Sequence, residues 1–224
     1  MIPVITIDGP SGAGKGTICQ LLAKKLGYSL LDSGALYRLT ALAGQLKGAD
    51  LADPDVMGKI AENLAVEFNV TDTGVAILLE GKDVSQAIRQ EQVGMDASQV
   101  AAYPQVRSGL LACQRQFAKL PGLVADGRDM GTTVFPDAPV KIFLTASAEE
   151  RAKRRVLQLE EKGETADMAT ILADIELRDK RDRERKESPL VPAADALELD
   201  STSLSIEGVL EEVLNVVQQK LALT

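Results

Sequence analysis

The segment Gly9–Thr17, which directly follows the apolar run Val4–Ile7, restricts the possible folds more than any other part of the sequence. It contains a glycine, four further residues and then Gly-Lys, the spacing of a phosphate-binding loop between a strand and a helix. Glycines let the backbone turn with positive φ and bring N–H groups against phosphate oxygens, which Cβ atoms would obstruct. Lys15 adds a mobile positive charge, and a helix from roughly Lys15 to Leu26 directs its positive dipole end at the same anion. The sequence therefore predicts a site for a nucleotide polyphosphate.

One position of this loop departs from the general pattern, because Gly16 stands where a Ser or Thr would bind Mg²⁺. Thr17 supplies a hydroxyl one residue later. The ending Gly-Lys-Gly-Thr resembles that of nucleoside monophosphate kinases more than that of motor ATPases or GTPases. The residues expected to bind the nucleotide are Gly9, Pro10, Ser11, Gly12, Ala13, Gly14, Lys15, Gly16 and Thr17.

The composition excludes several other classes of site. The net charge of −8 argues against a general nucleic-acid or anionic-membrane surface, so any phosphate site needs a local concentration of arginines. The chain has no histidine, which excludes imidazole bases and His-ligated metals. Cys19 and Cys113 have no metal-type spacing and are expected to be core residues in a reducing compartment. We expect a cytoplasmic monomer without a membrane span or signal peptide.

Apolar segments that alternate with helical patterns predict a five-stranded parallel sheet flanked by helices. The last helix is marked by apolar residues at helical spacing between Ile206 and Leu221. In such folds, ligands bind beyond the carboxyl ends of the strands, where the phosphate loop lies. The five predicted strands are Val4–Ile7, Ser29–Leu31, Gly122–Ala125, Lys141–Leu144 and Ala196–Leu199.

The long interval between the second and third predicted strands exceeds one crossover and indicates an inserted subdomain. Val66–Val70 and Val75–Leu79 flank the turn Thr71-Asp72-Thr73-Gly74, which predicts a β-hairpin. Two helices are expected to follow, at about Gln86–Ala101 and Pro104–Leu120, the second begun by its proline.

A charged helical run at residues 178–186 stops before Pro189. Mixed charges on a helix usually form a solvated face with ion pairs one turn apart. However, Arg178, Arg181, Asp182 and Arg185 are three or four residues apart, which predicts one face carrying three guanidiniums. Guanidinium groups offer bidentate hydrogen bonds to phosphate.

These segments together resemble the bacterial-type cytidylate kinases, which transfer phosphate from ATP to CMP or dCMP. Besides the phosphate loop, the resemblance rests on Leu31-Asp32-Ser33-Gly34-Ala35-Leu36-Tyr37-Arg38, Ala125-Asp126-Gly127-Arg128-Asp129-Met130-Gly131-Thr132 and the pattern Arg178-Asp179-x-x-Asp182-x-x-Arg185. It covers essentially the whole chain. It implies a P-loop kinase fold with a core (1–32, 120–160, 189–224), an insertion that binds the monophosphate (33–119) and a lid (161–188).

The resemblance also implies roles for individual residues. Lys15 is expected to hold the donor's β and γ phosphates, and Arg38, Arg128 and Arg185 to hold the acceptor phosphate. Ser98, Arg107 and Asp129 resemble readers of cytosine, whose exocyclic amine and adjacent acceptors complement a carboxylate and a guanidinium. Arg178 and Asp182 resemble ribose ligands, although either is also a candidate for a structural ion pair in the lid, and Asp129 for a pair with Arg128. Ser33 is expected near the acceptor phosphate, and Arg181 joins the expected catalytic groups Lys15, Arg128 and Arg185.

Thr17 and Asp126 are the candidate Mg²⁺ residues, acting directly or through water. Asp126, at the end of the third predicted strand, resembles the Walker B carboxylate of such kinases, with a helix-capping role as the alternative. Phosphoryl transfer needs alignment and charge neutralisation rather than a protein nucleophile, so arginines, one lysine and Mg²⁺ suffice. Two alternatives remain open from the residues: a kinase for UMP or AMP, and a non-catalytic ATP-binding switch.

Overall fold

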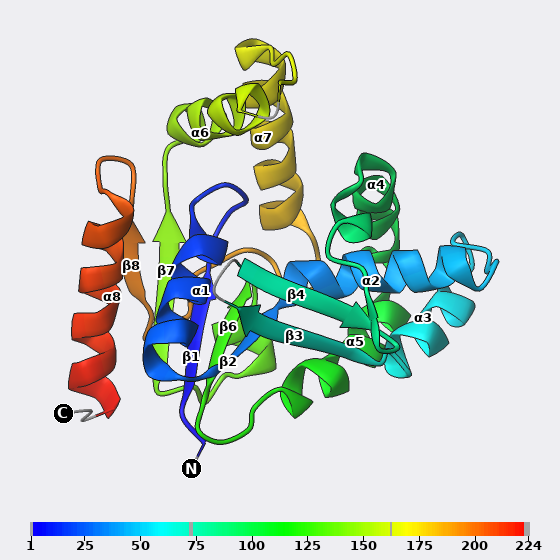
Figure 1. Ribbon diagram of the computed structural model, residues 1–224, viewed down its shortest axis with the longest axis horizontal. Helices are drawn as coiled ribbons and strands as arrows, with labels where there is room; N and C mark the ends of the chain where they lie inside the picture. The colour runs from blue at the N-terminus through cyan, green and yellow to red at the C-terminus, as the bar shows by residue number, and fades with distance from the viewer. Residues whose placement is uncertain (1, 72–73, 162, 222–224) are drawn as a thin grey trace. The chain divides into compact units, whose positions relative to one another are not determined.

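The computed structural model describes residues 2–71, 74–161 and 163–221 and has an α/β fold (Figure 1). Its larger sheet has five strands in the order β2-β6-β1-β7-β8, and the register places β1 parallel to β7, β7 parallel to β8, and β2 parallel to β6. The chain divides into two compact units, one formed by Met1–Val4 and Ala23–Asp126 (unit 1) and one by Ile5–Leu22 and Gly127–Thr224 (unit 2).

In the described residues, unit 2 contains the phosphate loop, most of three sheet strands and five helical segments, one of them shared with unit 1. Helices α6 and α7 pack against each other, and α8 packs on β7 (Figure 1). Its elements are β1 (Val4–Asp8), α1 (Lys15–Leu26, which continues into unit 1), the π-helical turn η2 (Met130–Val134), β7 (Val140–Thr145), α6 (Ala148–Glu160), α7 (Met168–Glu184), β8 (Leu197–Asp200) and α8 (Ile206–Leu221).

Unit 1 contains the β2–β6 pair, a small antiparallel sheet β3-β4-β5 and a group of helices in which α3 packs on α5 and α2 on α4. Its elements are β2 (Ser29–Asp32), α2 (Ser33–Leu46), α3 (Pro54–Glu62), β3 (Val66–Thr71), β4 (Gly74–Leu79), β5 (Lys82–Asp83), the 3₁₀ turn η1 (Ala87–Arg89), α4 (Glu91–Val100), α5 (Pro104–Gln116) and β6 (Leu123–Gly127).

The five predicted strands and the hairpin are confirmed with shifts at their ends, while the middle of the hairpin turn, residues 72–73, lies outside the described residues. The single helix predicted at Gln86–Ala101 is wrong: Gln90 is extended at φ −60° and ψ 144° and separates η1 from α4. Helix α5 ends at Gln116 rather than Leu120, because the chain turns toward Pro121 and β6.

Local sequence explains where several elements begin and how they pack. The Asp32 carboxylate accepts from the Ala35 N–H at 2.9 Å and caps α2, and Ser147 caps α6 through the Glu150 N–H. Every residue of β1 is buried, as expected for a central parallel strand. The apolar face of α8 buries Val209, Val213 and Val217, whereas Ile206 at its start is half exposed. Across the described chain, none of the helices has the length and apolar character needed to cross a bilayer.

Candidate active site

The phosphate loop follows β1 and has the backbone that its glycines predict. Gly9, Gly12 and Gly14 have φ values of 150°, 82° and 95°, which lie in or beyond the left-handed region that glycine favours. At Gly9 a side chain is also excluded by space, since a Cβ there would lie 2.0 Å from the carbonyl oxygen of Leu144. The loop therefore depends on glycine both for its turns and for its close approach to β7.

Lys15 is the first residue of α1, and its side chain is buried. Its ammonium Nζ donates a hydrogen bond of 2.9 Å to the carbonyl oxygen of Pro10 within the loop. The charge predicted to meet a phosphate is thus held inside the curve of the loop, at the positive end of a helix.

Residues that follow β7 and β8 hold the outside of the loop. The Ser201 hydroxyl contacts the carbonyl oxygens of Ala13 at 3.1 Å and Thr145 at 2.9 Å, which ties the loop to the ends of both strands. The Arg151 guanidinium donates to the Ser11 carbonyl oxygen at 3.0 Å. These contacts hold the carbonyl groups of Ser11 and Ala13 in the loop.

Asp8, the last residue of β1, joins the loop to the segment after β6. Its carboxylate accepts from the backbone N–H groups of Met130 and Gly131, each at 2.8 Å. Burial raises the pKa of this carboxyl from 3.8 to about 6, opposed by the two N–H donors and by Lys15, while the negative charge of Asp129 raises it further. No role was predicted for Asp8 from the sequence. An acidic residue at the end of a strand that is otherwise mostly apolar is the sequence feature that marks it.

The structure brings Arg128, Asp182 and Arg185 together in unit 2. Nε of Arg128 donates to the Asp182 carboxylate, and Nη1 of Arg185 lies 3.8 Å from the other oxygen of that carboxylate. Asp182 therefore pairs with Arg128, which lies outside the predicted lid, as well as facing Arg185. Asp129 is buried next to Arg128 at the start of η2.

Arg185 directly follows the last residue of α7 and forms its C-cap. Its φ of −64° is helical and its N–H bonds to the Arg181 carbonyl, whereas its ψ of 141° turns the following chain back, with the Leu190 N–H bonded to the Asp182 carbonyl. The Arg185 side chain still returns toward Asp182 and donates from Nε to the Ser188 carbonyl oxygen at 2.6 Å. Arg178 and Arg181 lie on α7 itself, on its exposed surface.

In unit 1, helix α2 carries two of the predicted acceptor residues. Ser33 is buried at its first position and its hydroxyl accepts from the Gln114 amide at 3.2 Å. Nη1 of Arg38 donates to the Ile88 carbonyl oxygen at 3.0 Å. The Arg38 guanidinium also lies against Gly94 of α4, where a Cβ would approach Nη1 to 2.9 Å.

The two other predicted residues of unit 1 lie on helices beside α2. Ser98 is exposed on α4, one turn after Gly94, and its hydroxyl donates to the Gly94 carbonyl at 3.1 Å. Arg107 on α5 places its guanidinium carbon 5.7 Å from the centre of the Tyr37 ring on α2, a cation–π contact. Unit 1 therefore gathers Ser33, Arg38, Ser98 and Arg107 around α2 and its neighbours.

The candidate metal residues are oxygen donors on separate units. Thr17 is exposed in the first turn of α1, and Asp126 is half-buried near the end of β6, opposite Asp32 of β2 in the register. A hydroxyl and a carboxylate fit Mg²⁺, which prefers oxygen ligands and keeps several waters. Within residues 2–71, 74–161 and 163–221, no cluster of three or more Cys, Asp or Glu side chains is arranged to hold a metal.

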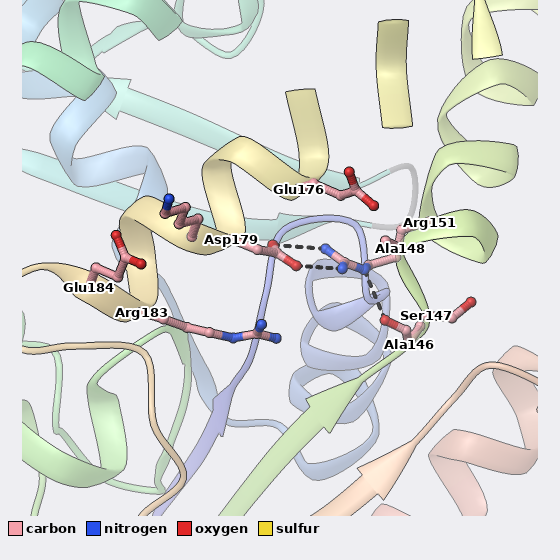
Figure 2. A pocket seen from close by; sticks show the side chains of 9 residues that line it. Ala146, Ser147, Ala148, Arg151, Glu176, Asp179, Arg183 and Glu184 are labelled. Atoms are coloured by element: carbon pink, nitrogen blue, oxygen red, sulfur yellow. Dashed lines mark hydrogen bonds and ion pairs between the residues drawn. The ribbon is translucent and has the colours of Figure 1, made fainter. Parts of the chain in front are cut away.

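A pocket of about 480 Å³ lies in unit 2 where α6 and α7 meet the end of β7 (Figure 2). Its wall includes Arg151, which contacts the phosphate loop, and Asp179, which pairs with Arg151. Neither residue was assigned a role from the sequence, because nothing in the local pattern distinguishes a buried charged residue from a solvated one. The lining residues are Ala146, Ser147, Ala148, Arg151, Glu176, Asp179, Lys180, Arg183 and Glu184.

Comparison with known proteins identifies close relatives. A family model described as "Cytidylate kinase" matches residues 5–219. Proteins named "Cytidylate kinase" from Escherichia coli (strain K12 / DH10B) and Shigella boydii serotype 18 are each 59% identical over 221 residues, covering 99% of this chain and 97% of the relative. Among solved structures, shikimate kinase from Bacteroides thetaiotaomicron has a TM-score of 0.50 at 13% identity, with 100% of both chains covered. This last similarity concerns the fold alone.

Proposed function

The chain belongs to the cytidylate kinase family, and we infer from this that it transfers the γ-phosphoryl group of ATP to CMP or dCMP. The observation that carries this function is the family match over residues 5–219, together with a 59% identity that extends over 99% of the chain. The products are ADP and CDP or dCDP.

The reaction needs no protein nucleophile. An oxygen of the CMP phosphate attacks the γ-phosphorus, the bond from that phosphorus to the β,γ-bridging oxygen breaks, and ADP leaves with the electron pair. Because the acceptor is already an anion, a strong general base is unnecessary, which agrees with a chain lacking histidine.

We propose that the donor phosphates bind the N–H groups from Gly12 to Thr17 and the Lys15 ammonium. This is supported by the positive φ of Gly12 and Gly14 and by Lys15 being held inside the loop. The pocket beside α6 and α7 is assigned to the donor side as well, because Arg151 in its wall contacts the loop. Arg181 is assigned to neutralise charge that develops on the transferred group.

The acceptor phosphate is assigned to Arg38, Arg128 and Arg185, with Ser33 nearby. Ser98, Arg107 and Asp129 are assigned to cytosine, and Arg178 and Asp182 to the ribose. The contact of Asp182 with both Arg128 and Arg185 supports placing the ribose and phosphate ligands of unit 2 in one cluster. The assignment of Asp129 to the base follows from its charge, since a carboxylate accepts a hydrogen bond from the exocyclic amine of cytosine.

When bound, Mg²⁺ would neutralise the phosphate oxygens of ATP and help align them. Thr17 and Asp126 are the residues assigned to hold it, directly or through water. The monomeric state, the cytoplasmic location and the division of the chain into core, insertion (33–119) and lid (161–188) rest on the sequence and stay predictions.

The decisive experiment measures ADP formation with Mg-ATP and CMP, dCMP, UMP or AMP in turn. We expect rapid ADP formation with CMP and dCMP and much slower formation with UMP and AMP. A preference for UMP or AMP would identify a different monophosphate kinase. ADP formation that does not depend on any acceptor would indicate an ATP-hydrolysing switch.

A further inference from the structure

Arg151 uses its guanidinium to connect three separate segments of unit 2. Nε donates to the Ala146 carbonyl oxygen at 2.9 Å, just after β7. Nη1 donates to the Ser11 carbonyl oxygen of the phosphate loop at 3.0 Å and to the Asp179 carboxylate of α7, also at 3.0 Å. Nη2 donates to the second Asp179 oxygen at 2.6 Å, which completes a bidentate pair (Figure 2).

The stem of the same side chain supports the loop backbone. A Cβ placed on Gly12 would lie 3.3 Å from Cβ of Arg151, 3.6 Å from its Cγ and 3.7 Å from its Cδ. The loop at Gly12 therefore rests against the aliphatic part of Arg151 while Ser11 is held by its head. Arg151 therefore fixes the loop at two neighbouring residues, Ser11 and Gly12.

The Arg151–Asp179 pair is buried, with side-chain exposures of 3% and 9%. A buried ion pair gains little net stability, because the desolvation of both charges offsets their attraction. Its geometry, in contrast, is strict, since the planar guanidinium must face the carboxylate while its other nitrogens meet two carbonyls. This favours a role in positioning over a role in stability.

Asp179 belongs to α7, the helix of the predicted lid, and a run of charged residues surrounds it. Glu176, Arg183 and Glu184 line the same pocket as the pair (Figure 2), and so does Lys180. Through Asp179 and Arg151, the position of α7 is thus linked by direct hydrogen bonds to the loop that is assigned to the donor phosphates.

We propose that Arg151 is a positioning residue for the donor nucleotide: held by Asp179, it sets the conformation of the phosphate loop at Ser11 and Gly12 and couples it to α7. This inference rests on the proposed function for its assignment of the loop to ATP. If it is correct, a substitution that breaks the Arg151–Asp179 pair must weaken the binding of the ATP or ADP nucleotide much more than the binding of CMP.

The first test compares Arg151→Lys with the wild type by calorimetric titration of Mg-ADP and by KM for ATP and for CMP. Lysine keeps the charge but lacks the fork that reaches Ala146, Ser11 and Asp179 together. We expect the Kd of Mg-ADP and the KM of ATP to rise by about ten-fold or more, since small misplacements of binding groups are costly. The KM of CMP should stay within about two-fold of the wild-type value.

A control variant in the same unit is Asp195→Asn, which removes the charge of an exposed carboxylate that pairs with Lys141 at 2.9 Å. It should leave the Kd of Mg-ADP unchanged. Because Mg-ADP titration does not depend on the acceptor, it stays informative even if the wild type fails to phosphorylate CMP. Such a failure would reject the proposed function, not the coupling.

The second test is the double variant Arg151→Met/Asp179→Leu, which replaces the buried pair by apolar side chains. Such replacements are often neutral or stabilising, so we expect a folded protein with an unfolding midpoint near that of the wild type. It should still bind Mg-ADP at least about ten-fold more weakly, because the contact with Ser11 is gone. A folded double variant with wild-type affinity for Mg-ADP, or a single variant that loses ADP and CMP binding equally, would overturn the proposal.

Discussion

Nε of Arg128 donates a hydrogen bond to the carboxylate of Asp182, which joins the segment after β6 to the last turn of α7. The Arg128 and Asp182 side chains are partly buried, 18% and 16% exposed. Arg185 approaches the same carboxylate at 3.8 Å. One carboxylate therefore orients two of the arginines that we assign to the acceptor phosphate, so the guanidiniums are arranged by the protein itself rather than by the substrate alone.

Replacing Arg128 by alanine should reduce kcat by about 100-fold or more, because a preorganised charge next to the transferred phosphoryl group is lost. The thermal unfolding midpoint should change little, since Arg185 still faces the Asp182 carboxylate when Arg128 is removed. Steady-state kinetics and calorimetry measure the two quantities. Lys47→Ala, which removes the exposed pair with Glu80 at 3.0 Å, is the control. Near-normal turnover of Arg128→Ala would reject the role assigned to Arg128.

Lys15→Ala should reduce kcat/KM for ATP by about 100-fold or more, again through lost charge stabilisation. The fold should be retained, because Lys15 contributes a hydrogen bond within its own loop rather than core packing. Lys25→Ala, an exposed lysine in the last turn of the same helix, should behave as the wild type. Equal activities of the two variants would contradict the assignment.

Asp129→Ala should reduce the preference for CMP over UMP. A carboxylate accepts a hydrogen bond from the exocyclic amine of cytosine and repels O4 of uracil, a difference worth about ten-fold to 100-fold in kcat/KM. The ratio of kcat/KM for CMP and UMP measures it, with the exposed residue Asp137 replaced by alanine as the control. An unchanged ratio would show that another residue reads the base.

Gly94→Ala should weaken the binding of CMP while making the folded protein more stable. The new Cβ would approach Nη1 of Arg38 to 2.9 Å, and the flexible guanidinium must move away. Since Arg38 is assigned to the acceptor phosphate, we expect the KM of CMP to rise several-fold while the KM of ATP stays constant. Alanine within α4 should raise the free energy of unfolding by about 0.5–1 kcal/mol. Gly208→Ala in α8, where the nearest atom is 3.5 Å away, should change only the stability.

Asp8→Asn should remove a pH dependence of stability. Asp8 has a pKa of about 6 in the folded protein and 3.8 as the ordinary value, so folding favours its protonated form. The wild type should lose roughly 3 kcal/mol relative to Asp8→Asn as the pH rises from about 4 to about 6, and no more at higher pH. Urea unfolding of both proteins across this range measures the difference. A constant difference would mean that Lys15 and the N–H donors of Met130 and Gly131 fully offset the burial of Asp8.

Most secondary structure could be predicted because its signals are local. The apolar runs of the sheet strands, Pro104 at the start of α5 and the glycines of the phosphate loop each act through neighbouring residues. The wrong predictions of helix bounds concern places where the chain changes direction although the residues on both sides favour a helix. Gln90 breaks the predicted helix at Gln86–Ala101, and α5 ends at Gln116 instead of Leu120.

By itself, the sequence determined the phosphate loop, the order of strands and helices along the chain and the family, because these depend on residues that are contiguous or occur in a fixed order. Only the tertiary structure decided which charged groups meet. Asp8 with Gly131, Arg128 with Asp182 and Arg151 with Asp179 join residues from separate segments. Helical or strand periodicity reports which residues share a face, but the partner of a buried charge is chosen by the packing of whole elements, such as α6 against α7.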